Sequence, residues 1–173
     1  MVSDQRQRTA PDIDLSSSAS FEDVVEAESG RIFAALRLVA GDRREAETLM
    51  LDAFMDVWDR WDRVRASGDA AGELFRTAIA MYQRRLASDA TARRRRKPFP
   101  ASDPLVELEK ADDILVALDT LEPKERLSLV LMDLYGYPSK EVGELMGIRA
   151  ADVRAYASHG RAELRRQLGN GDG

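Results

Sequence analysis

A proline-rich break near the middle of the chain separates two segments that both have the apolar spacing of helices. On either side of the break, apolar residues recur every three or four positions, and no long stretch alternates with a period of two. The break reads "KPFPASDP" at residues 97–104, and its three prolines lack the N–H group that a helix needs. The sequence therefore predicts an all-α protein of two small helical domains joined by a Pro-rich linker.

This break sets the expected domain boundaries. Residues 1–20 are polar and lack the apolar stretch of a secretory signal, so we expect a disordered leader. We assign residues 21–97 to the first domain, 98–111 to the linker and 112–173 to the second domain. No apolar run approaches the roughly 20 residues that span a bilayer, which predicts a cytoplasmic protein without membrane insertion.

The composition argues against most enzyme classes. The chain has no cysteine, and His159 is its single histidine. These counts exclude thiolate zinc sites, cysteine nucleophiles and imidazole-rich metal sites. We therefore expect a protein that is not an enzyme and that has no metal and no cofactor.

Positive charge is concentrated in two places although the net charge is −5. An acidic average argues against general affinity for nucleic acid, so such contacts would have to be local. One concentration is "RRRRK" at residues 93–97, after the third predicted helix, and the other lies in the last helical segment. Residues 93–97 could contact phosphates or could equally be a solvated helix end favoured by the helix dipole.

The helical stripes predict which side chains are buried. Asp42, with Glu45 three residues later, resembles a capping box and starts the second helix, whose inward stripe runs through Trp58 to Trp61. In the second half, Pro123 is expected in the first turn of a helix that buries Leu134.

Residues 137–168 have the outline of a helix-turn-helix. A short helix with Ser139 as the expected N-cap leads through the turn "GIRA" into a longer helix. The inward stripe of this last helix is Val153, Ala157, Gly160, Leu164 and Leu168. The remaining surface could contact DNA through Arg149, Arg154, Tyr156, Ser158, Arg161 and Arg165. The arginines could contact phosphates or guanine edges, whereas Tyr156 could equally pack on a thymine methyl or sugar or cover the turn.

Two features of this helix leave alternatives open. The arginines could merely balance Glu163 and the helix dipole, as surface arginines often do. Asp152 would be repelled by phosphate unless it caps the helix N-terminus or accepts a hydrogen bond from a cytosine amine. We favour the cap.

The second half of the chain resembles region 4 of the sigma-70 family of bacterial RNA polymerase specificity factors, in their small extracytoplasmic-function (ECF) form. The resemblance covers about residues 112–168, and its matching motifs run from "LDTLEPKERLSLVLMDLYG" to "RAELRRQL". The matching positions are Leu118, Leu121, Pro123, Arg126, Gly136, Ser139, Glu141, Val142, Leu145, Gly147, Ile148, Val153, Arg161, Leu164 and Arg165.

The first half is similar to region 2 of the same family. "GDRREAETLMLDAFMDVW" at residues 41–58 follows the family pattern, and the third predicted helix continues into the arginines as it does there. The resemblance implies an ECF-type sigma factor, whose partners are core RNA polymerase and promoter DNA, with an anti-sigma factor as a further candidate.

The resemblance also implies a role for particular residues. Those expected to bind core polymerase are Thr48, Leu51, Asp52 and Met55. Those expected near the minus-10 element are Arg84, Arg85, Arg93, Arg94, Arg95 and Arg96, whereas residues 149–165 are expected in the major groove at minus 35.

Two other functions are compatible with parts of the sequence. A sigma-like regulatory protein could bind polymerase or another regulator without opening promoters, because Thr48 and Leu51 replace an acid and a glutamine of the family pattern. A regulator of the LuxR type would share the helix-turn-helix, but it would not need the block at residues 41–58.

Overall fold

The computed structural model describes residues 19–92 and 109–169, and every regular element in these residues is helical. The expected all-α class is therefore confirmed. In chain order the elements are α1 (Phe21–Ala40), α2 (Arg43–Asp59), α3 (Trp61–Ala66), α4 (Ala70–Ala92), α5 (Glu109–Asp119), α6 (Pro123–Leu129), the π-helix η1 (Val130–Leu134), α7 (Ser139–Met146) and α8 (Ala150–Gly169).

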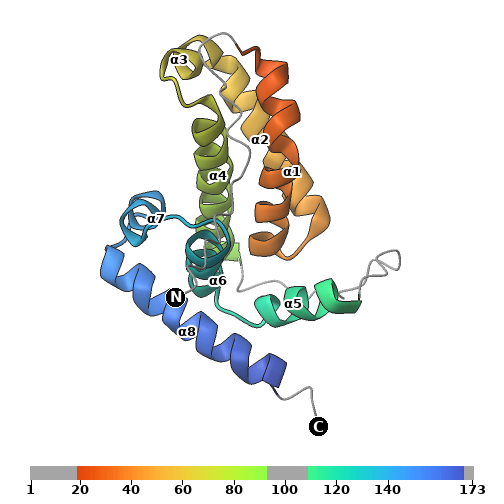
Figure 1. The fold of residues 1–173 in the computed structure, drawn as a ribbon, viewed down its shortest axis with the longest axis vertical. Coiled ribbons are helices and arrows are strands. Elements are labelled where there is room, and N and C mark those ends of the chain that lie inside the picture. Colours follow the sequence, from red (N-terminus) through yellow and green to blue (C-terminus); the bar gives the residue numbers. More distant parts are fainter. Residues whose placement is uncertain (1–18, 93–108, 170–173) are drawn as a thin grey trace, which may run out of the picture.

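Helices α1, α2 and α4 form an upright bundle, with α3 across its upper end and α5 to α8 at its lower end (Figure 1). Gly41 ends α1 in the left-handed region, with φ 75°, and the next residue starts α2. As predicted, Asp42 is the N-cap of α2, and its side chain accepts from the N–H of Glu45 at 2.8 Å. The tight turn sets α1 against α2, which places their apolar stripes on the same core.

The expected inward position of Trp58 is wrong, because its side chain is 50% exposed. Helix α2 ends at Asp59, and Arg60 leaves helical geometry with φ −123° and ψ 22°. Arg60 is held there by Asp56 at 2.8 Å and by the hydroxyl of Thr77 at 2.6 Å. Trp58 lies near this end of α2, at the edge of the bundle, and its ring packs edge-on against Phe21 with 5.0 Å between the ring centroids.

A π-helical turn overturns the expected burial of Leu134, which is 62% exposed. Pro123 starts α6 as predicted, but the helix widens after it, and the N–H of Tyr135 bonds to the carbonyl of Val130, five residues earlier. The wider turn rotates Leu134 away from the core. It also directs Tyr135 and Tyr137 toward the N-terminal bundle.

The two halves of the chain share one apolar core. Phe75 of α4 is fully buried and lies 5.3 Å from the ring of Tyr135 and 5.4 Å from that of Tyr137. Arg31 of α1 stacks over Phe75 at 4.6 Å, and the Tyr135 hydroxyl donates to the carbonyl of Arg31 at 3.1 Å. These aromatic contacts join α1 and α4 to the segment that follows α6.

The buried Arg126 forms a second connection between the halves. Its guanidinium donates to the carbonyl oxygens of Val39 in α1, Asp119 in α5 and Leu121, at 3.3, 3.0 and 3.5 Å. It also forms an ion pair of 2.9 Å with the carboxylate of Asp119. The predicted leader and linker fall mostly outside the described residues.

The described helices include none that is both long enough and apolar enough to cross a membrane.

Candidate nucleic-acid and protein interfaces

Helices α7 and α8 form a helix-turn-helix whose turn is held by close backbone packing. Gly147 takes the left-handed conformation, with φ 63°, that ends α7. The N–H of Ile148 donates to the carbonyl of Gly143 at 3.0 Å. A β-carbon at Gly143 would lie only 2.7 Å from the carbonyl oxygen of Ile148. A side chain at residue 143 would therefore push the turn away from α7.

We expect Gly143→Ala to lower the free energy of unfolding by about 1–3 kcal/mol, because the extra methyl group overlaps backbone that cannot move independently. Urea denaturation followed by circular dichroism measures the change. Gly30→Ala in α1 is the matched control, since nothing lies within 4 Å of the β-carbon it adds. The control should be neutral or slightly stabilising; equal destabilisation by both substitutions would contradict the prediction.

The inward face of α8 is largely as predicted. Val153, Ala157 and Gly160 are buried, with Gly160 against the backbone of Glu125 in α6, whereas Leu168 is 47% exposed. The absence of a side chain at Gly160 lets α8 approach α6 closely. The predicted contact residues Arg149, Arg154, Ser158 and Arg165 are exposed, and Tyr156 and Arg161 are partly exposed.

Three arginines of this surface have partners within the chain. Arg149 forms a two-point contact with Asp152, Arg154 donates to the hydroxyl of Ser139 at 3.0 Å, and Arg161 donates to both carboxylate oxygens of Asp133. The sequence predicted Ser139 as the N-cap of α7, and this prediction is wrong. Pro138 occupies that position, without a side-chain capping bond.

Asp152 pairs with the side chain of Arg149, a partner that the sequence did not predict. The carboxylate accepts from Nε and Nη2 of Arg149, each at 2.9 Å. The hydrogen bond from Arg149 lowers the pKa of Asp152, with backbone contact to the same residue adding to it. Asp152 thus stays ionised well below neutral pH, within the first turn of α8.

The residues expected near the minus-10 element are only partly described. Arg84 and Arg85 are exposed in the last turns of α4. Arg93, Arg94, Arg95 and Arg96 lie outside the described residues.

The four residues expected to bind polymerase share one exposed face of α2. Thr48, Leu51, Asp52 and Met55 are all exposed, with Leu51 at 57% and Met55 at 62%. Trp58 belongs to this face and was missed as a surface residue. Its spacing of three residues from Met55 and seven from Leu51 was the available signal, because such residues lie on one side of a helix.

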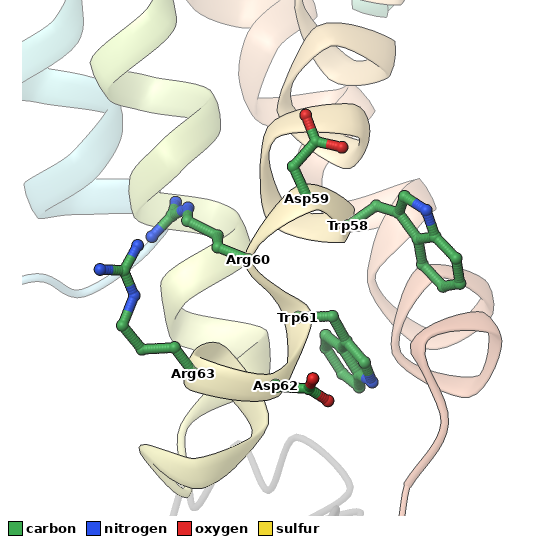
Figure 2. Close-up of a pocket in the computed structure, with 6 residues that line it drawn as sticks. All are labelled: Trp58, Asp59, Arg60, Trp61, Asp62 and Arg63. Atoms are coloured by element: carbon green, nitrogen blue, oxygen red, sulfur yellow. The ribbon is translucent and has the colours of Figure 1, made fainter.

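A hollow at the junction of α2 and α3 is lined by Trp58, Asp59, Arg60, Trp61, Asp62 and Arg63. In Figure 2 the two indole rings lie on one side of the chain and the guanidinium groups of Arg60 and Arg63 on the other. A small-molecule site needs polar groups that converge on one ligand. These side chains diverge, and the described residues contain no group of acidic or histidine side chains arranged to hold a metal ion.

Comparisons with known proteins agree with this arrangement. Residues 111–164 match the family model "Sigma-70, region 4". The chain is 26% identical over 165 residues to the ECF RNA polymerase sigma factor SigE of Mycolicibacterium smegmatis, covering 90% of this chain and 64% of that protein. It is 35% identical over 71 residues to the ECF RNA polymerase sigma factor SigJ of Mycobacterium tuberculosis, covering 39% of this chain and 23% of that protein. The chain thus spans less than two thirds of the length of either relative.

A solved structure has a similar fold. The sigma factor RpoE of Bartonella quintana, determined in complex with the anti-sigma factor NepR, superposes with a TM-score of 0.67 at 18% sequence identity. The match covers 88% of this chain and 98% of the other.

Proposed function

We propose that the chain is an ECF-type sigma factor of the sigma-70 family, which is supported by the region 4 match of residues 111–164 and by the similarity to two ECF RNA polymerase sigma factors. It binds core RNA polymerase and directs the polymerase to particular promoters. The polymerase carries out the chemistry of transcription, and this chain supplies the position at which it starts. Its place of action is the cytoplasm, where polymerase and chromosome meet.

The observation that carries this proposal is the helix-turn-helix within the region 4 match. Helix α8 is held by its buried stripe, which leaves Arg149, Arg154 and Arg165 exposed near or along its outer face. A helix held in this manner can enter the major groove, where arginines contact phosphates and guanine edges. We assign α8 to the minus-35 element, and Arg84 and Arg85 to DNA near the minus-10 element.

The exposed face of α2 supports the second half of the proposal. Leu51, Met55 and Trp58 present apolar side chains that are 57%, 62% and 50% exposed. Thr48 and Asp52 border them. Apolar side chains in such a row mark a protein-binding surface, and we assign this face to core polymerase. An anti-sigma factor that covered the same face would exclude the polymerase.

Replacing Leu51 and Met55 together by aspartate should weaken core polymerase binding by more than tenfold, because both apolar contacts are lost and two charges enter the interface. Fold stability should change little, since both side chains are exposed. Co-purification with bacterial core polymerase and run-off transcription from genomic fragments measure the effect.

Leu168→Asp is the control, because Leu168 is an exposed apolar residue near the end of α8. It should retain polymerase binding. If the wild-type chain gave no run-off transcript from any fragment, the proposed function would be contradicted. Polymerase binding without transcription would instead favour a sigma-like regulator that does not open promoters.

A further inference from the structure

Asp152 is an acidic residue in the first turn of a helix that we propose to contact DNA, and its side chain forms an ion pair with Arg149. The side chain of Arg149 is 83% exposed, and the residue lies in the turn between α7 and α8. Its backbone is fixed, since its carbonyl accepts from the N–H groups of Asp152 and Val153 at 3.0 and 3.1 Å. An ion pair this exposed contributes little to stability. Its geometry therefore needs another explanation.

The contact leaves part of the guanidinium available for a ligand. Arginine has five N–H groups in one plane. Asp152 uses the edge formed by Nε and Nη2, with one hydrogen bond to each of its oxygens. The end of the group, formed by Nη1 and the second N–H of Nη2, has two parallel donors. Two such donors match O6 and N7 of guanine in the major groove.

The pair also changes the electrostatics of the helix entrance. A guanidinium held by a carboxylate has no net charge as a unit, so it loses most of its attraction for phosphate. It keeps its directed donors. By contrast, Arg154 is paired with a neutral hydroxyl and retains its full charge.

We propose that Asp152 is a positioning residue, which holds Arg149 ready to read a guanine and reduces its affinity for DNA of any other sequence. This inference rests on the proposed function, because it assumes that α8 enters the major groove. It assigns base recognition to the entrance of α8 and leaves phosphate contacts to arginines further along the helix.

Glu163 and Arg166 provide a matched control on the same helix. They form the same kind of two-point pair three residues apart, with Nε of Arg166 3.0 Å from Glu163. Glu163 lies 11 residues after Asp152, which is about 16 Å along the axis. Glu163→Gln removes the same charge as Asp152→Asn, but at a distance from the helix entrance.

The experiment is selection from a duplex library with a randomised segment about one helical turn long. The full-length chain is used with and without bacterial core polymerase. Wild type and Glu163→Gln should select the same motif. In Asp152→Asn, the preference for guanine at one position should fall by roughly tenfold, and Arg149→Lys should lose preference at that same position.

Salt dependence provides a second readout that a structural role for Asp152 would not change. Asp152→Asn frees one cation for phosphate, so the slope of log K against log salt should become steeper by about one for random DNA. The thermal midpoint should stay that of wild type. If Asp152→Asn retained every base preference, or lost preference evenly across positions, the inference would be overturned while the proposed function stood. A wild-type chain that selected no motif would overturn both.

Discussion

Phe75→Ala should lower the free energy of unfolding by about 3–5 kcal/mol, the cost of removing a fully buried aromatic ring. Phe75 connects three elements. Tyr137 stacks on it at 5.4 Å and 13°, Tyr135 lies against it at 5.3 Å, and Arg31 covers it at 4.6 Å. Truncation would leave a cavity between α1, α4 and the segment after η1, so the loss should be near the upper end of that range.

Guanidinium chloride denaturation followed by circular dichroism measures this loss. Phe75→Leu is the control, since it retains apolar volume while removing the ring, and it should cost about 1–2 kcal/mol. A loss below about 1 kcal/mol for Phe75→Ala would mean that the aromatic contact between the two halves contributes little.

Arg126→Ala should lower the free energy of unfolding by about 3 kcal/mol. Arg126 is 7% exposed, and its Nη atoms donate to backbone carbonyls in or next to α1 and α5. Truncation leaves these carbonyls without their charged donor and leaves a cavity where the side chain lay. The same denaturation experiment measures the loss. If the two halves unfold together, the helical signal should disappear in a single transition with a lower midpoint.

Asp119→Asn separates the ion pair of Arg126 from its hydrogen bonds to backbone carbonyls. The carboxylate of Asp119 is 57% exposed, so the ion pair itself should contribute less than about 1 kcal/mol. The carbonyl of Asp119, which also accepts from Arg126, is unchanged by this substitution. If Asp119→Asn were as destabilising as Arg126→Ala, the ion pair and not the carbonyl contacts would dominate.

The sequence predicted those parts of the fold that local patterns determine. The capping role of Asp42 and the buried stripe of Val153, Ala157 and Gly160 depend on neighbours within one or two turns, and such spacing can be read directly. The exposed face of α2 was predicted from the similarity to a known family and not from local spacing. All four residues named for that face lie on it.

The errors arose where contacts between distant segments override local spacing. Leu134 had the correct spacing for burial, but a π turn moved it to the surface while Tyr135 and Tyr137 packed on Phe75. Ser139 has the character of an N-cap, yet its hydroxyl meets Arg154, fifteen residues later. The sequence also did not show that Asp152 pairs with the side chain of Arg149. These choices between partners depend on three-dimensional positions that a linear pattern does not contain.

The edge-on contacts of Phe21 with Trp58 at 5.0 Å and with Trp61 at 5.5 Å gather both tryptophans of the chain at one corner. This corner lies at the end of the molecule opposite α8 (Figure 1). Intrinsic indole emission is therefore a local optical probe, with one half-exposed ring beside Leu51 and Met55. A titration can follow occupancy of that face without any dye, while occupancy of α8 leaves the emission unchanged.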